Sequence, residues 1–368
     1  LKAQIRIIDD KDKLIEELQK EICKLKEENQ TLQAFKKAKK VDLERDNVFI
    51  GEDDQENHKI LKKICEGATS VAYKIIDERT SEVMCKKVVK SVDDEQAFKK
   101  LRNSLKEFGA IASISHPSIC RAIGMNTQEK VTKNTDENGY DKDSGNEEED
   151  KREKTTIALF FEYLPFKLKD FNCNSEKDSD NEDEEFMNNS LRVKIAIEVA
   201  FGMNHLHRAG MIHRDLKIEN IMLNYILEAK IIDFNLVHVE NNDDGSLTKG
   251  IGTFDYMSPE MLNNKDYDNK TDVYSYGIVL FVLLTGRLPK RNLTDKMNKK
   301  PIEFPNHSLP ITSEGIELIK MCTSFEEKDR PSFSDIIEFI GNKKCALMKE
   351  IDIDILSGRY EELKQYGV

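Results

Sequence analysis

An ordered set of polar motifs in the second half of the chain restricts its fold more than any other feature. The segment His-Arg-Asp-Leu-Lys-Ile-Glu-Asn occupies 213–220, Asp-Phe-Asn follows at 233–235, and Ser-Pro-Glu stands at 258–260. One such short segment could arise by chance, but this order and spacing together are very improbable. The set therefore predicts one catalytic unit that uses acidic, amide and lysine side chains.

The three motifs resemble the catalytic loop, the metal-binding motif and the end of the activation segment in the protein kinase superfamily. The resemblance covers 59–342, roughly three quarters of the chain. It implies an α+β, two-lobed protein kinase fold with a small β-rich N-lobe at 59–164 and a larger helical C-lobe at 165–342. It also implies transfer of the γ-phosphoryl group of ATP, with Mg²⁺, to protein substrates.

Phosphoryl transfer depends on positioning and charge neutralisation, and the motif residues suit both requirements. By the resemblance, Asp215 accepts a hydrogen bond from the substrate hydroxyl and takes its proton, while Lys217 points toward the γ-phosphate. Asn220 and Asp233 would supply oxygen ligands to Mg²⁺, which prefers hard donors.

Residues 65–74, Cys-Glu-Gly-Ala-Thr-Ser-Val-Ala-Tyr-Lys, align with the glycine-rich loop that covers ATP phosphates. Only Gly67 of the three usual glycines is present, and Ala72 replaces the usual valine. Fewer glycines leave the backbone less free to approach phosphates. The small side chains at these positions still allow nucleotide binding.

The lysine that pairs with ATP phosphates is Lys86 or Lys87, and an ungapped alignment with the family selects Lys87. Because side chains alternate along a strand, Cys85 and Lys87 would share the nucleotide face while Lys86 points away. Glu107 lies nine residues before His116. That spacing matches the helix glutamate that pairs with the strand lysine in active kinases.

The end of the segment 156–164 resembles the hinge that binds adenine through its backbone. Phe161 falls at the gatekeeper position, where its bulk should close the back pocket, and Glu162 to Leu164 follow as the hinge. The resemblance therefore predicts that Glu162 and Leu164 contact the nucleotide.

Three further residues are expected to stabilise the fold rather than take part in chemistry. Glu260 of Ser-Pro-Glu should pair with Arg330 of Asp-Arg-Pro-Ser. Asp272 should brace the catalytic loop. It lies in the segment 272–280, which resembles the tyrosine-kinase-like group, whose members mostly phosphorylate serine and threonine.

The lysine of the catalytic loop and the segment 252–260 also resemble serine/threonine kinases, although a dual-specificity enzyme is an alternative. Asn235 stands where the family has the glycine of Asp-Phe-Gly. Asparagine tolerates left-handed backbone well, so Asp233 could still reach a metal. The reduced glycine-rich loop and Asn235 leave a second function open, a pseudokinase-like scaffold that binds partners without efficient transfer.

The hydrophobic pattern predicts short strands within 59–126, a helix at 93–114 and a strand at 156–164. Helices are expected after that strand, and the last of them forms a helical tail within 343–368. Their ranges are 191–209, 257–262, 271–286, 313–323, 333–341 and 343–366.

Two acidic stretches, 127–155 and 172–190, carry −10 of the net charge of −12 and are predicted to be polar insertions. The remainder is near neutral, which argues against a nucleic-acid partner because such a protein needs a basic face. The longest apolar run, 278–284, is too short for a membrane span. Seven cysteines without a pairing or zinc spacing indicate reduced thiols, so a cytoplasmic location is expected.

Residues 1–40 are predicted to form a coiled-coil helix, and the heptad residues at 8–32 to form a homodimer. The pattern has β-branched residues and one asparagine at a positions and leucine at d positions: Ile8, Ile15, Ile22, Asn29, Leu18, Leu25 and Leu32. A single helix packed on the kinase lobe is the alternative. Arg214 before the catalytic aspartate suggests regulation by phosphorylation of Ser246 or Thr248, in trans within the dimer.

Overall fold

The computed structural model describes the chain over several ranges separated by gaps. These ranges are 49–50, 58–66, 70–89, 108–109, 111–130, 154–171, 187–233, 238–239, 254–263, 268–304 and 310–367. The predicted coiled coil at 1–40, Gly67, Glu107, Asn235 and the two activation-segment hydroxyls lie outside the described residues, as does most of each acidic stretch.

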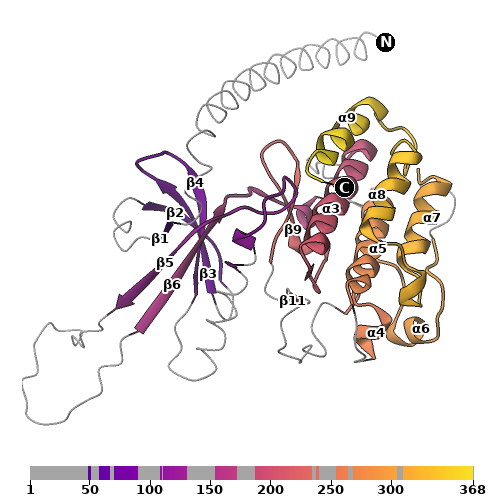
Figure 1. The fold of residues 1–368 in the computed structure, drawn as a ribbon, viewed down its shortest axis with the longest axis horizontal. Coiled ribbons are helices and arrows are strands. Elements are labelled where there is room, and N and C mark those ends of the chain that lie inside the picture. Colours follow the sequence, from indigo (N-terminus) through magenta and orange to yellow (C-terminus); the bar gives the residue numbers. More distant parts are fainter. Residues whose placement is uncertain are drawn as a thin grey trace, which may run out of the picture. The chain divides into compact units, whose positions relative to one another are not determined.

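The first half of the chain forms an antiparallel β-sheet (Figure 1). Its strands are β2 His58–Glu66, β3 Ser70–Asp77, β4 Val83–Val89, β5 Ala122–Lys130 and β6 Lys154–Glu162, preceded by the two-residue strand β1 Phe49–Ile50. Hydrogen-bonded neighbours follow the order β5-β6-β4-β3-β2. Asp77 closes the β3–β4 turn, since its Oδ1 accepts the amides of Arg79 and Thr80 at 2.8 and 3.3 Å.

Alternating side chains divide this sheet into two apolar faces, as the period of a strand requires. Ile75, Met84, Ala158 and Phe160 pack together in one cluster, and Val89, Phe108, Ile157 and Leu159 pack in another. Residues on neighbouring positions of β6 therefore belong to opposite faces.

The paired strands β5 and β6 extend into both ends of the first predicted insertion, 127–155. Thr127 pairs with Ile157, and the last pair joins Lys130 to Lys154. Backbone pairing between the two strands therefore continues through residues that are too polar to show an alternating strand pattern. The second stretch is also shorter than 172–190, because Asn188 caps helix α3 by accepting the Leu191 amide at 2.8 Å.

From Phe166 onward the described chain is mostly helical (Figure 1). Its helices are α3 Asn189–Arg208, α4 Pro259–Leu262, α5 Lys270–Thr285, α6 Leu293–Met297, α7 Ser313–Cys322, α8 Phe333–Asn342 and α9 Ile353–Lys364, with 3₁₀ turns η1 Leu168–Asp170, η2 Ile218–Asn220 and η3 Glu327–Asp329. Short strands lie among them: β7 Phe166–Lys167, β8 Met211–Ile212, β9 Ile221–Leu223, β10 Ala229–Ile231 and β11 His238–Val239. The prediction of an α+β fold with a β-rich lobe before a helical lobe is confirmed.

Helix α5 forms the centre of the helical lobe, and all its residues from Thr271 to Thr285 are buried. Gly277 allows close packing on α7, because a Cβ there would lie 2.6 Å from Thr323 Cγ2 and 2.8 Å from Cys322 Cβ. The apolar run at 278–284 is thus the core of this lobe. Among the helices that the structure describes, none has the length and apolar character needed to cross a membrane.

The predicted helix at 343–366 is wrong over its first ten residues. Helix α8 ends at Asn342, and Lys344 and Cys345 then adopt positive φ angles of 50° and 59°. Met348 forms an isolated bridge with Ile311, and Asp352 caps the new helix α9 by accepting the Ile355 amide at 3.1 Å. Left-handed backbone and a bridge to a distant residue are tertiary features that helical periodicity does not reveal.

Candidate active site

The loop that carries Asp215 is anchored to the buried carboxylate of Asp272 on α5. The amides of His213 and Arg214 each donate to this carboxylate at 2.8 Å, and His207 Nε2 lies 2.8 Å from its Oδ2. Burial alone raises the pKa of Asp272, but the hydrogen bond and the positive potential of His207 lower it below its usual value. Asp272 therefore stays ionised and braces the loop, as expected from the sequence.

The anchored loop presents three polar side chains to one point. Lys217 Nζ lies 2.6 Å from Asp215 Oδ2, and Asn220 Nδ2 donates to the same oxygen at 3.0 Å. Asn220 also donates to the Asp215 carbonyl at 2.8 Å, and Arg214 takes a positive φ of 67° in the turn before them. The aspartate is thus fixed in direction by its neighbours.

The β9–β10 hairpin brings Asp233 next to this cluster. Ile231 pairs with Ile221, and the Ile232 amide donates to the Asn220 carbonyl at 2.9 Å, so the residue after β10 lies beside the residue before β9. Asp233 has a φ of 63°, and its Oδ1 is buried without a hydrogen-bond partner in the described part of the chain.

A buried carboxylate oxygen without a partner is costly unless a ligand satisfies it. Asn220 and Asp233 together offer the amide and carboxylate oxygens that Mg²⁺ takes when it binds through few protein ligands and substrate phosphates. The described residues contain no cluster of three or more His, Cys, Asp or Glu side chains that could hold a metal by themselves. The oxygen donors of Asn220 and Asp233 fit a Mg²⁺ ion that binds through few protein ligands.

Strand β4 places Cys85 and Lys87 on the same face of the sheet. Lys87 pairs with Ala72 on β3 and with Leu159 on β6, while Lys86 Nζ lies over the ring of Phe160, 5.7 Å from its centroid. Phe160 and Leu159 belong to different faces, so the two lysines point to opposite sides. Burial raises the pKa of the Cys85 thiol to about 11.

Glu162, the last residue of β6, connects the sheet to the β9–β10 hairpin. Its Oε1 accepts the Arg121 amide at 2.7 Å and lies 3.2 Å from Lys230 Nζ on β10. Phe161 packs edge-on against Phe108, with ring centroids 5.7 Å apart. Leu164, also predicted at the site, is buried with 6% of its surface exposed.

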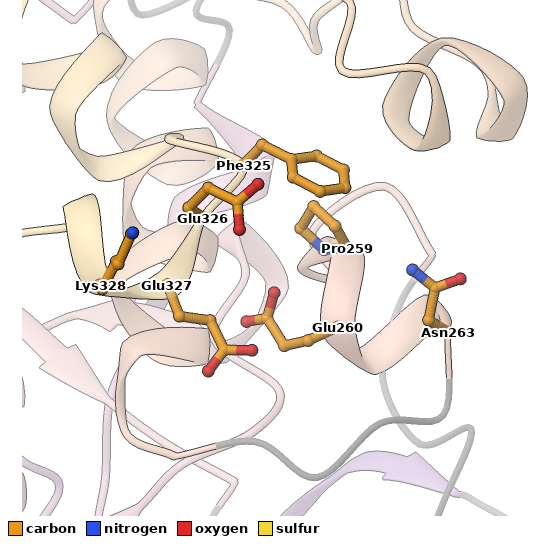
Figure 2. A pocket seen from close by; sticks show the side chains of 7 residues that line it. All are labelled: Pro259, Glu260, Asn263, Phe325, Glu326, Glu327 and Lys328. Atoms are coloured by element: carbon orange, nitrogen blue, oxygen red, sulfur yellow. The ribbon is translucent and has the colours of Figure 1, made fainter.

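The end of the Ser-Pro-Glu motif is held by the expected ion pair. Arg330 donates from Nη1 and Nη2 to the two oxygens of Glu260, at 2.6 and 2.8 Å, and both side chains are buried. Figure 2 shows Glu260 directed from α4 toward the segment that carries Glu326 and Glu327. A pocket of about 250 Å³ lies there; its lining residues are Pro259, Glu260, Asn263, Phe325, Glu326, Glu327 and Lys328.

Two lysines that join distant segments were missed by the sequence analysis. Lys230 lies 3.2 Å from Glu162, and Lys296 on α6 donates to the carbonyls of Phe254 and Asp255 at 2.9 and 2.7 Å. Burial lowers the pKa of Lys296 to about 8. Both lie outside recognisable motifs, and their partners are distant in sequence, so no local signal identifies them.

A model of the protein kinase domain matches residues 58–339. The chain belongs to the protein kinase family. A probable serine/threonine-protein kinase of Dictyostelium discoideum is 30% identical over 286 residues, which are 77% of this kinase and 27% of the relative. Two Arabidopsis thaliana proteins are also similar. Serine/threonine-protein kinase STY17 is 35% identical over 44% of this chain and 28% of its own length.

The second Arabidopsis relative is serine/threonine/tyrosine-protein kinase HT1, which is 37% identical over 39% of this kinase and 38% of its own length. This kinase therefore spans about a quarter to two fifths of the length of these three relatives. The prediction of the family from the ordered motifs is confirmed. The serine/threonine relatives also agree with the predicted tyrosine-kinase-like group.

Proposed function

We propose that this chain is a protein kinase that transfers the γ-phosphoryl group of ATP to serine and threonine hydroxyls of protein substrates. The observation that carries the proposal is the convergence of Lys217 and Asn220 on Asp215. The backbone next to Asn220 leads to Asp233, whose buried Oδ1 has no hydrogen-bond partner among the described residues. The serine/threonine kinase names of the relatives support the choice of hydroxyl.

In this mechanism the chain positions the reacting groups and balances their charge. Asp215 accepts the hydrogen bond of the substrate hydroxyl and takes its proton as the new bond forms. Lys217 holds Asp215 in place and supplies positive charge where the transferred group carries negative charge. Asn220 and Asp233 would hold Mg²⁺, which when bound with ATP screens the charge of the phosphates.

The sheet would bind the nucleotide. Lys87 would pair with its phosphates, with Glu107 as the partner of this lysine and Gly67 in the loop above. Adenine would lie against the hinge and against three apolar or small side chains, Ala72, Cys85 and Leu164. The shared face of Ala72 and Cys85 on β3 and β4 supports this arrangement, because Ala72 and Lys87 are cross-strand partners and Cys85 lies two residues before Lys87.

Exchanging the two neighbouring lysines for methionine tests the proposed activity and the register together. Lys87→Met should lower the rate of Mg²⁺-dependent phosphoryl transfer by about 10²-fold or more, because it removes a charge that stabilises the transferred group. Lys86→Met is the matched control and should keep the wild-type rate, since Lys86 lies over Phe160. Transfer rates measured with labelled ATP decide this, and the opposite ranking would contradict the assignment.

We further propose that the kinase is a homodimer through residues 8–32, which raises the rate at which one copy phosphorylates Ser246 or Thr248 of the other. The heptad pattern and the position of Arg214 before Asp215 support this regulation. Deletion of residues 1–40 should give a monomer whose autophosphorylation rate rises with protein concentration. Sedimentation and mass spectrometry test it. A monomeric intact chain, or equal autophosphorylation after deletion, would contradict the proposal.

The free thiols favour a reducing compartment, and we propose the cytoplasm. The described cysteines all carry free thiols: Cys65, Cys85, Cys120, Cys322 and Cys345. Burial raises the pKa of most of them, so these thiols are poor nucleophiles.

A further inference from the structure

Helix α9 lies beyond the part of the chain that matches the kinase domain, which ends at residue 339. It nevertheless packs against α3, and Leu356, Tyr360 and Leu363 belong to the main hydrophobic core of the helical lobe. Tyr360 lies edge-on to Phe201 of α3 with ring centroids 5.4 Å apart. A segment outside the matched kinase domain is therefore built into the lobe that carries Asp215.

The buried carboxylate of Glu198 connects α9 to the hairpin that carries the metal ligands. Arg359 Nε on α9 donates to Glu198 Oε1 at 2.7 Å, and Glu198 Oε2 accepts the amide of Ala229 at 2.7 Å. Ala229 is the first residue of β10, whose other end leads to Asp233. The Glu198 side chain has no exposed surface, so its orientation depends on these partners.

Arg359 also forms an ion pair with Glu228 in the turn of the β9–β10 hairpin. Arg359 Nη1 lies 3.0 Å from Glu228 Oε1, and Asn224 Nδ2 donates to Glu228 Oε2 at 2.8 Å. Lys194 on α3 adds a third contact, since its Nζ donates to the Leu227 carbonyl at 2.8 Å. The β9–β10 turn is therefore fixed by α3 and α9 together.

A second series of contacts connects the residues after α9 to the last residue of β10, Ile231. Tyr366 packs edge-on against His116, with centroids 5.8 Å apart, and His116 Nδ1 accepts the Ser118 amide at 3.0 Å. The Ser118 carbonyl accepts the Ile231 amide at 2.9 Å. Both routes from the C-terminal segment thus end on β10, one at its first residue and one at its last.

The residue after β10 reaches the metal site directly, because the Ile232 amide donates to the Asn220 carbonyl and Asp233 follows. We propose that α9 is a positioning element for the metal-binding hairpin, with Arg359 and Glu198 as positioning residues that set the placement of Asp233 relative to Asn220. The inference rests on the proposed role of this pair in holding Mg²⁺ with the nucleotide.

The hydrogen bond between the Glu198 carboxylate and the Ala229 amide depends on the positive charge of Arg359. Burial raises the pKa of Glu198, and the cations of Lys194 and Arg359 oppose that rise. Removing the arginine takes away a cation and the hydrogen bond from its Nε to Glu198, which favours the neutral carboxyl and weakens its acceptor role toward Ala229. Charge-assisted hydrogen bonds are about twice as strong as neutral ones, so the hairpin should loosen.

The test compares Arg359→Met with Lys364→Met in the full chain. Lys364 is the matched control on the same helix. Its side chain is 52% exposed, and that of its ion-pair partner Glu361 is 65% exposed. Binding of a fluorescent ATP analogue is titrated with Mg²⁺, and amide hydrogen exchange is followed over 221–233. Arg359→Met should raise the Mg²⁺ concentration at half-saturation by about three- to tenfold and speed exchange in this segment. Lys364→Met should change neither.

Glu228→Gln is the second variant in case Arg359→Met does not fold, because the Glu228 side chain is partly exposed, at 21%. It should shift both readouts in the same direction. Unchanged Mg²⁺ half-saturation and unchanged exchange in a folded variant would overturn the inference and make α9 a structural cap only. Wild-type nucleotide affinity that does not change with Mg²⁺ concentration would also overturn the inference. Absence of phosphoryl transfer with intact Mg²⁺-dependent binding would contradict the proposed function alone.

Discussion

Asp215→Asn is expected to lower the rate of phosphoryl transfer by about 10²- to 10⁴-fold, the usual contribution of a positioned general base. The amide keeps the size of the carboxylate but cannot take the proton of the substrate hydroxyl. It also loses the charge that Lys217 faces at 2.6 Å. Transfer from labelled ATP to a protein substrate, at saturating Mg²⁺ and nucleotide, measures the effect.

The nucleotide itself should bind Asp215→Asn nearly as well as it binds the wild type, because Asn220 and Asp233 are unchanged. Glu219→Gln is the matched control, since it makes the same chemical change at an exposed position of the same loop. It should keep the wild-type rate. Equal rates in Asp215→Asn and the wild type would show that another group acts as the base.

Arg330→Met is expected to destabilise the fold by about 3–5 kcal/mol, because it leaves Glu260 as a buried charge without its partner. The Arg330 side chain is fully buried, and its guanidinium also donates to three carbonyl oxygens: Lys270, Ser324 and Phe325. Single domains have only about 5–15 kcal/mol of stability in total, so a loss of this size is large. Urea unfolding followed by circular dichroism measures it.

An exposed ion pair nearby provides the control for this substitution. Lys299 lies 2.8 Å from Glu326, but the two side chains are 60% and 51% exposed. Lys299→Met should therefore cost at most about 1 kcal/mol. A loss for Arg330→Met as small as that of the control would mean that the buried pair contributes little to this fold.

The sequence predicts the catalytic loop well because its residues are close together and their roles are chemically distinct. Asp215, Lys217 and Asn220 span six positions and meet within hydrogen-bonding distance. The anchors Asp272 and Arg330 were also predicted, since each lies in a recognisable segment. The assignment of Lys87 rather than Lys86 as the nucleotide lysine stays a prediction, although the two point to opposite faces.

The features that the sequence did not predict depend on contacts between residues that are distant in the chain. Arg359 and Glu198 are 161 positions apart, and no local pattern relates them. The break before α9 depends on left-handed residues and on the bridge from Ile311 to Met348, which override helical periodicity there. The β5–β6 ladder likewise extends through polar residues because each strand satisfies the backbone of the other.

The most direct test of the central claim is the transfer of labelled γ-phosphate from ATP to a protein substrate by the full chain, with and without Mg²⁺, followed by phosphoamino-acid analysis. We expect Mg²⁺-dependent label on serine and threonine, which falls about a hundredfold or more in Asp215→Asn. Label confined to tyrosine, or wild-type transfer no faster than that of Asp215→Asn, would contradict it.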